Sequence, residues 1–211
     1  MSRGFYLVIT QDRAYDLVRF LRFLLKFNRC SIHIEFAGDS LDAYRKKTQV
    51  GMLSPFETTV MLDTDTLVNG ELDHLFHVAE SGFLSMAFED VPACWNTGVM
   101  CIPGHLKKKL SLAWHPAFEE HIKDPAHRTS GGFDQEVLNR LLRDMPGFVP
   151  VKRLPDAYNY ILKWRTPEQE ARDFDDVKIF HFLHDDDKMH PCDRTRFRSW
   201  QIYTSPPSLD V

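Results

Sequence analysis

The sequence lacks a long apolar run and a cysteine framework. No stretch approaches the roughly 18 apolar residues that span a membrane, and the apolar run at residues 5–10 is too short for a secretory signal. Four cysteines occur without a C-x-x-C pair: Cys30, Cys94, Cys101 and Cys192. They are too sparse for a disulfide scaffold, so a reducing compartment is the simpler expectation. We therefore expect a soluble, cytoplasmic protein with no transmembrane segment.

An excess of basic residues is also missing, as are several catalytic motifs. With 26 basic and 30 acidic residues the formal charge is −4, so we expect no nucleic-acid partner and infer that any phosphate group is held locally. The sequence contains no G-x-S-x-G elbow and no G-x-x-x-x-G-K-[ST] loop. His74, His77 and the other histidines form no H-E-x-x-H framework, which argues against a structural zinc.

The composition that is present is typical of a globular protein. The 211 residues are 43% hydrophobic and 27% charged, a balance that argues against disorder. A chain of this length buries about 70% of its unfolded surface on folding. We expect one domain over residues 1–211, either alone or as part of a longer chain.

The order of the first elements predicts the fold class. A β-branched and aromatic run at residues 5–10 is typical of a strand buried on both faces. Apolar residues recur at helical spacing over residues 14–27, and a second strand is expected at residues 31–36. This β-α-β order predicts an α/β, Rossmann-like fold whose mostly parallel central sheet is flanked by helices. Ligands of such sheets bind outside the carboxyl ends of the strands.

Further along the chain the same patterns predict more elements and two interruptions. We expect strands at residues 58–62, 82–88, 95–102 and 177–183, and helices at residues 41–52, 72–81, 105–122 and 134–145. The helix at 105–122 is expected to break at Pro116. Residues 123–133 contain proline, serine and glycine and are expected to form a flexible loop.

Two carboxylates follow the predicted strand at residues 58–62. Asp63 and Asp65 lie where an α/β sheet presents its ligand site. The bend at the strand end lets both carboxylates reach one hard cation, which can in turn hold a diphosphate. The alternative interpretation is two loop acids, one of which caps the following turn.

Five segments, taken in order, carry a resemblance to a known family. They are residues 61–68 (MLDTDTLV), 95–102 (WNTGVMCI), 133–139 (FDQEVLN), 154–159 (LPDAYN) and 179–182 (IFHF). This order resembles the glycosyltransferases with the GT-A fold, especially the glycogenin and lipopolysaccharide galactosyltransferase group. The resemblance covers roughly residues 5 to 190 and implies a GT-A fold.

The resemblance implies a metal site and a donor-sugar site. Asp63 and Asp65, with Thr64 between them, match the D-x-D that binds Mn²⁺ or Mg²⁺ and through it the diphosphate of a nucleotide sugar. His181 matches the third metal ligand, and neutral imidazole suits Mn²⁺. The alternative for His181 is a partly buried histidine bonded to a backbone carbonyl. Asn96 matches an asparagine near the donor sugar, and its alternative is a strand bulge beside a glycine.

The resemblance also implies the catalytic pair Asp134 and Gln135. In the family the acid binds sugar hydroxyls and the amide faces the anomeric carbon; from the sequence alone Asp134 is equally a helix N-cap. Two positions depart from the family, since His184 and Asp187 replace a glycine and a lysine. Lys188 follows one step later and is the candidate cation for the diphosphate.

Other candidate donor contacts are less specific. The basic residues Arg45, Lys46 and Lys47 precede the D-x-D at the distance of a family cation near the donor phosphates, with a solvated helix face as the alternative. Thr10, Gln11 and Asp39 lie near the ends of the first two predicted strands and are candidates for base and ribose contacts.

The sequence therefore predicts a metal-dependent glycosyltransferase. It is expected to move a sugar from a nucleotide-diphosphate sugar, by resemblance a UDP-sugar, to an acceptor hydroxyl of a glycan or glycoconjugate. Retention and inversion both remain open, because Asp134 also suits the role of a carboxylate base. The alternatives are a non-catalytic nucleotide-sugar-binding domain and a haloacid-dehalogenase-like phosphatase, which residues 60–66 (VMLDTDT) resemble.

Overall fold

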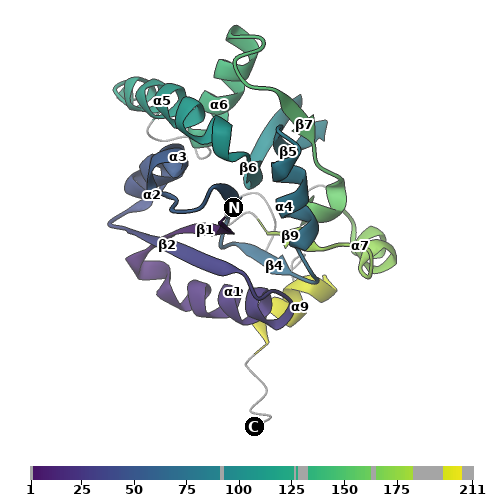
Figure 1. The fold of residues 1–211 in the computed structure, drawn as a ribbon. Helices are drawn as coiled ribbons and strands as arrows, with labels where there is room; N and C mark the ends of the chain where they lie inside the picture. Colours follow the sequence, from purple (N-terminus) through teal and green to yellow (C-terminus); the bar gives the residue numbers. More distant parts are fainter. Residues whose placement is uncertain are drawn as a thin grey trace.

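The computed structural model describes residues 2–90, 93–125, 127, 133–162, 165–182 and 197–205. Within these residues a six-stranded sheet forms the centre of the molecule (Figure 1). Its strands run in the order β2 (Ser31–Ala37), β1 (Arg3–Thr10), β3 (Thr58–Leu62), β6 (Ala93–Ile102), β5 (Leu84–Asp90) and β7 (Val151–Arg153). Helices flank this sheet, which confirms the predicted α/β class.

The sheet is mixed rather than uniformly parallel. The first unit is the predicted β-α-β: β1, the crossover helix α1 (Ala14–Phe27) and β2, with β1 parallel to β2 and to β3. β7 is also parallel to its neighbour β5, whereas β6 is antiparallel to both β3 and β5. Two residues separate β5 from β6 in the sequence, too few for the crossover that a parallel pair needs.

Two apolar clusters cover opposite faces of the sheet. Successive residues of β1 point to opposite faces, so Phe5 and Leu7 join one cluster and Tyr6 joins the other. The first cluster packs against α1, α4 (Asp73–Glu80) and α9 (Arg198–Thr204), and the second against α5 (Gly104–His121) and α6 (Phe133–Asp144). Figure 1 shows α5 and α6 above the sheet and α1 and α9 below it.

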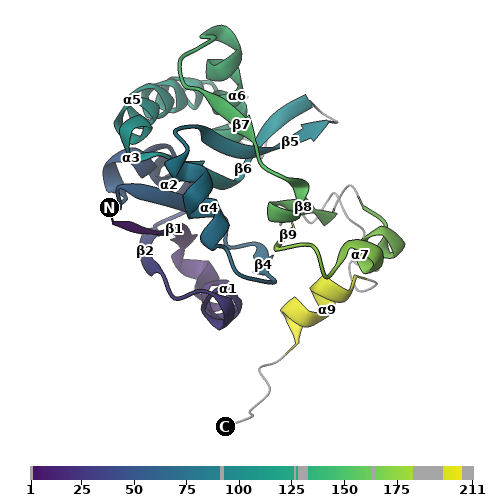
Figure 2. The ribbon, with the colours of Figure 1, turned by 45° about the vertical axis from the view of Figure 1, so that its right-hand side comes forward.

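A second, three-stranded sheet lies beside the first and was only partly predicted. It consists of β4 (Thr66–Val68), β9 (Ile179–His181) and β8 (Tyr160–Ile161), and Figure 2 shows it close to α7 (Pro167–Asp173) and α9. β9 is the late strand expected at residues 177–183. Because β4 follows the D-x-D directly and pairs with β9, Thr66 lies opposite His181.

Two expectations about helices are wrong. α5 is continuous through Pro116 instead of breaking there. Pro116 has no N–H to donate, so the carbonyl of Leu112 loses its helical partner. Both residues are on the exposed side of the helix, where water can hydrate that carbonyl. Buried Trp114 and Phe118 anchor the adjacent turns. The helix expected over residues 41–52 is divided into α2 (Ser40–Thr48) and α3 (Val50–Leu53). Among the described helices, none is both long and apolar enough to cross a membrane.

Candidate functional site

The fold brings together the three side chains predicted to bind a metal. Asp63 comes directly after β3, Asp65 precedes β4, and His181 ends β9, which is paired with β4. Their ligand atoms all lie within 4.8 Å of one another, and His181 Nε2 is 3.4 Å from Asp65 Oδ1. Local bonds fix the backbone here, because the Thr66 hydroxyl donates to the Asp63 carbonyl and the Phe182 N–H donates to the Asp65 carbonyl.

This donor set fits a divalent cation. Two carboxylates supply hard oxygen ligands and the imidazole supplies a nitrogen, a combination that suits Mn²⁺ and, with more oxygen from water, Mg²⁺. His181 is almost fully buried, whereas the side chains of Asp63 and Asp65 are 23% and 16% exposed, so a cation here has access to water or phosphate oxygens. The alternative in which His181 bonds a backbone carbonyl is not observed, since its Nδ1 lies 2.8 Å from Asn159 Oδ1.

The electrostatics of the site favour a cation. Burial raises the pKa of Asp63, and the neighbouring Asp65 charge raises it further, against the opposing effect of Lys47. Burial lowers the pKa of His181, but the charge and hydrogen bond of Asp65 outweigh it and the net pKa is raised. Asp65 contributes to both shifts, so negative charge from the two carboxylates meets at this point, where a divalent ion would offset it.

A buried lysine links the metal candidates to α6. Lys47, in the last turn of α2, places its Nζ 2.9 Å from Asp63 Oδ1 and 2.9 Å from Asp134 Oδ2. Burial lowers the pKa of this lysine, but Asp134 and Asp63 raise it by more, so the ammonium stays charged. Of the three basic residues that the sequence offered, Lys47 is therefore the one at the carboxylate cluster.

β6 positions the predicted catalytic pair at the start of α6. The Thr97 hydroxyl donates to Asp134 Oδ2 at 3.0 Å, and the Thr97 N–H donates to Gln135 Oε1 at 3.1 Å. The Asp134 carboxylate is thus engaged by Thr97 and Lys47. Thr97 was not singled out from the sequence, although it lies between Asn96 and Gly98 in a segment that carried the resemblance.

Asn96 belongs to the same site and needs the neighbouring glycine. Its Oδ1 accepts from the Gly98 N–H at 2.8 Å and from Asn159 Nδ2 at 2.7 Å, and its Nδ2 donates to Glu89. A Cβ atom on Gly98 would lie 2.7 Å from His181 Nδ1, closer than real contacts allow. Gly98 is therefore required by the close approach of the histidine ring.

The other candidates lie at the ends of β1 and β2. Thr10 ends β1 and is buried, and Gln11 begins the short helix η1 (Gln11–Arg13) and is exposed. Asp39 caps α2, its Oδ1 accepting from the Asp42 N–H at 2.7 Å. The remaining cation candidates make other pairs or are not described: Lys46 with Glu35 at 3.2 Å, Arg45 with Glu119 at 2.7 Å, and Lys188 outside the described residues.

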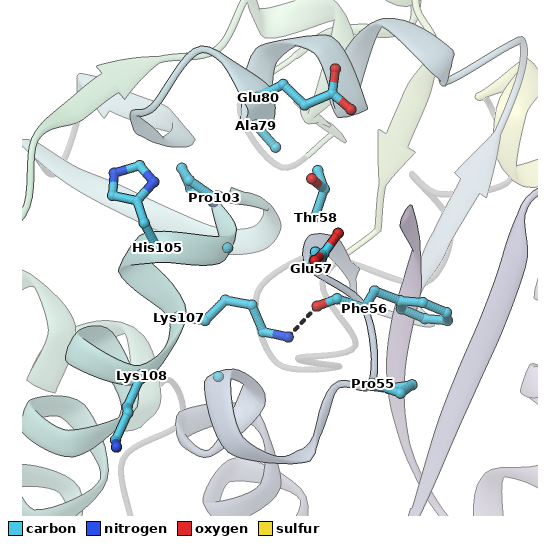
Figure 3. A pocket seen from close by; sticks show the side chains of 12 residues that line it. Pro55, Phe56, Glu57, Thr58, Ala79, Glu80, Pro103, His105, Lys107 and Lys108 are labelled. Atoms are coloured by element: carbon cyan, nitrogen blue, oxygen red, sulfur yellow. Dashed lines mark hydrogen bonds between the residues drawn. The ribbon is translucent and has the colours of Figure 1, made fainter. Parts of the chain in front are cut away.

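A separate cavity of about 880 Å³ lies at the opposite end of β3. Thr58, the first residue of β3, lines it, whereas Asp63 follows the last residue of that strand. Figure 3 shows Lys107 reaching toward the Phe56 carbonyl, to which it donates together with the Ser54 carbonyl. None of the predicted site residues lines this cavity.

Comparisons with known proteins agree with this geometry. No family model matches the chain. Human Glycogenin-2 is 28% identical over 152 residues, which are 67% of this chain and 28% of that protein. Among solved structures, the glycosyltransferase GlyE of Streptococcus pneumoniae TIGR4 gives a TM-score of 0.69 at 15% identity, covering 98% of this chain and 61% of that one. The galactosyltransferase LgtC, solved with donor and acceptor sugar analogs, gives a TM-score of 0.67 at 13% identity, and the match covers 97% of this chain and 98% of that one.

The fold and the comparisons together define the class. The chain has the GT-A fold of glycosyltransferases, and the resemblance drawn from its motifs is confirmed. It is similar to Glycogenin-2 and, in its fold, to the galactosyltransferase LgtC. The chain spans 28% of the length of Glycogenin-2 and 61% of GlyE.

Proposed function

We propose that the chain is a metal-dependent glycosyltransferase that moves a sugar from a UDP-sugar to an acceptor hydroxyl of a glycan or glycoconjugate. One observation carries this proposal. The candidate metal ligands Asp63, Asp65 and His181 lie within 4.8 Å of one another and are joined through Lys47 to Asp134. The cation-binding and sugar-binding residues of the family pattern therefore form one connected cluster.

The first half of the site would hold the diphosphate. Asp63, Asp65 and His181 would bind Mn²⁺ or Mg²⁺, which neutralises charge on a leaving diphosphate when bound. Lys47 places its ammonium between the carboxylates of Asp63 and Asp134 and offsets part of their negative charge. For the nucleoside, the carboxyl ends of β1 and β2 and the residues that follow them offer Thr10, Gln11 and Asp39, with Lys46 on the adjacent helix. Lys188 is retained as a candidate phosphate contact from the sequence alone.

The second half of the site would surround the sugar. Glycosyl transfer passes through an oxocarbenium-like transition state, so the sugar needs carboxylate and amide groups held in fixed positions around it. Asp134 and Gln135 are fixed by Thr97, and Asn96 is fixed by the Gly98 N–H and by Asn159. Retention requires one of the α6 side chains on the face opposite the leaving group, and inversion requires Asp134 as the base for the acceptor. Proton NMR of the first-formed product distinguishes these routes through the anomeric coupling.

Calorimetry with Mn²⁺ and a panel of UDP-sugars tests the proposal. Wild-type protein should bind a UDP-sugar in a Mn²⁺-dependent manner and transfer or hydrolyse the sugar. Asp65→Asn should weaken that binding by about tenfold or more, as loss of a ligand or its support does at metal sites. Asp73→Asn, a change at an exposed aspartate on α4, is the matched control and should bind like wild type.

Two results would contradict the proposal. Equal binding by Asp65→Asn and wild type would show that the D-x-D does not hold the donor. Binding without turnover across an acceptor panel would instead support the non-catalytic nucleotide-sugar-binding domain. The phosphatase alternative predicts release of phosphate from p-nitrophenyl phosphate, abolished by Asp63→Asn.

A further inference from the structure

A line of hydrogen-bonded side chains runs from the candidate metal ligand His181 into the central sheet. His181 Nδ1 lies 2.8 Å from Asn159 Oδ1, Asn159 Nδ2 lies 2.7 Å from Asn96 Oδ1, and Asn96 Nδ2 lies 2.7 Å from Glu89 Oε1. Asn159 and Asn96 are each 3% exposed and His181 is 2% exposed. The line crosses from β9 in the small sheet to β6 and β5 in the central sheet.

One backbone group fixes the direction of every bond in this line. The Gly98 N–H lies 2.8 Å from one amide atom of Asn96, and because a backbone N–H can only donate, that atom is the oxygen. The same oxygen faces Asn159, so Asn159 presents its NH₂ group to Asn96 and its oxygen to His181. An amide oxygen only accepts, so His181 Nδ1 carries a proton.

The proton on Nδ1 decides what the other ring nitrogen offers. In the neutral imidazole with Nδ1 protonated, Nε2 carries the lone pair, and Nε2 is the nitrogen that faces Asp65. In the opposite tautomer an Nε2–H would point at Asp65 and no lone pair would face the carboxylates. The Asn159 oxygen can only accept a hydrogen bond from Nδ1–H. It therefore selects the tautomer of His181 whose Nε2 lone pair can bind a cation beside Asp63 and Asp65.

We propose that Asn159 is a positioning residue that sets the tautomer and orientation of His181 for metal binding. This inference rests on the proposed function, because it requires His181 to be a metal ligand. Asn159 acts through His181 and through Asn96, so one amide ties the metal side of the site to the asparagine proposed to lie near the donor sugar.

Mn²⁺ titrations of nucleotide-free protein, followed by the paramagnetic resonance signal of free Mn²⁺, test this role without measuring turnover. Asn159→Ala should lower Mn²⁺ affinity by about 10- to 100-fold, the effect of removing a group that orients a metal-binding histidine. Asn159→Asp keeps an acceptor for Nδ1–H but sets a carboxylate oxygen against Asn96 Oδ1 in place of the donated bond, so it should retain more Mn²⁺ affinity than Asn159→Ala.

Asn139→Ala is the matched control. Asn139 is also an asparagine that bridges elements, bonding the Trp95 N–H, the Trp95 carbonyl and the Gln135 carbonyl, but it makes no hydrogen bond with His181. It should lower stability like Asn159→Ala and leave Mn²⁺ affinity unchanged. Urea unfolding of each variant confirms that the proteins compared are folded.

The outcomes separate this inference from the proposed function. If wild type binds Mn²⁺ and Asn159→Ala binds it equally well, the positioning role is wrong while the proposed function stands. If Asn159→Asp loses as much affinity as Asn159→Ala, the amide is merely structural and the tautomer role is wrong. Failure of the wild type to bind Mn²⁺ would overturn both.

Discussion

The buried ammonium of Lys47 compensates two carboxylates that come from distant parts of the chain. Asp63 follows β3 and Asp134 lies in α6, and both are 2.9 Å from Lys47 Nζ. Asp134 is 2% exposed, so without Lys47 its charge would be buried beside Asp63, with the Thr97 hydroxyl as the remaining side-chain donor among the described residues. Because such charges are costly to leave uncompensated, Lys47 contributes to the stability of the fold as well as to the site.

Lys47→Met should therefore lower the free energy of unfolding by about 3 kcal/mol, the lower end of the cost of breaking a buried ion pair. Lys46→Met is the matched control on the same helix. Lys46 pairs with Glu35 at 3.2 Å, and both side chains are partly solvated, so its loss should cost less than about 1 kcal/mol. Urea unfolding at neutral pH measures both values. Equal destabilisation by the two changes would show that the buried ion pairs of Lys47 stabilise the fold no more than the partly solvated pair of Lys46 does.

At the scale of elements, α7 holds the N-terminus of α9 through one carboxylate. Glu170 is 1% exposed, and its oxygens accept from the Ser199 N–H at 2.8 Å and the Arg198 N–H at 3.3 Å. α9 in turn packs Trp200 and Tyr203 against Phe182, the residue after His181. The contact therefore helps to hold α9 against the end of β9.

Glu170→Ala should lower the free energy of unfolding by about 2 kcal/mol, because two N–H groups at a helix N-terminus lose a charged acceptor. Glu168→Ala, an exposed glutamate in the same first turn of α7, is the control and should change stability by about 0.5 kcal/mol or less. Thermal unfolding followed by circular dichroism measures both. A Glu170 variant as stable as its control would contradict the anchoring role.

The elements that the sequence predicted are those with a long, regular pattern. β1, α1 and β2 were expected within about two residues of their observed ends, because buried strands and amphipathic helices have clear periodicities. β4, β7 and β8 have three residues or fewer, too few to show a period. α7 was missed although Thr166, Pro167 and Gln169 form a capping box with proline in the first turn, a signal that could have been used.

The residues of the site likewise divide into those that the sequence predicted and those that it did not. Motifs named Asp63, Asp65 and His181, and the structure brings them together. The sequence could not choose Lys47 from its basic neighbours, because the choice depends on which side of α2 faces α6. Asn159 lay within a motif but had no assigned role, since its bonds to Asn96 and His181 join residues 63 and 22 positions away.

At the scale of the whole molecule, the site lies where the two sheets meet. Asp63 directly follows β3 of the central sheet, Asn96 lies in β6 of the same sheet, and His181 lies in β9 of the small sheet. Apolar clusters on both faces of the central sheet hold these strands, so the site residues are fixed by packing on either side. The formal charge of −4 omits any bound cation, which would offset the carboxylates at this junction.

Acid stability is a second property of the whole molecule that the structure predicts. Hydrogen bonds from Arg172 and from the Tyr160 hydroxyl hold the pKa of Asp173 below its ordinary value of 3.8, and the bond from Tyr160 ties α7 to β8. The folded protein therefore binds a proton at Asp173 less readily than the unfolded chain does. Asp173 contributes stability that is fully present well above pH 3.8 and is lost as the pH falls through the lowered pKa.

Asp173→Asn should therefore lower stability at pH 7 and reduce the further loss of stability on acidification below the ordinary aspartate pKa. Asp175→Asn, a change at an exposed aspartate two residues further along, is the matched control and should keep the wild-type profile. Urea unfolding at a series of pH values between 7 and about 3 measures both profiles, since the slope of stability with pH reports the difference in bound protons between the unfolded and folded states. If Asp173→Asn loses stability on acidification as steeply as Asp175→Asn, the hydrogen bonds to Asp173 do not contribute to acid sensitivity. If stability falls less steeply with acidification in Asp173→Asn than in Asp175→Asn, these hydrogen bonds do contribute. The link between α7 and β8 then weakens as the protein is acidified.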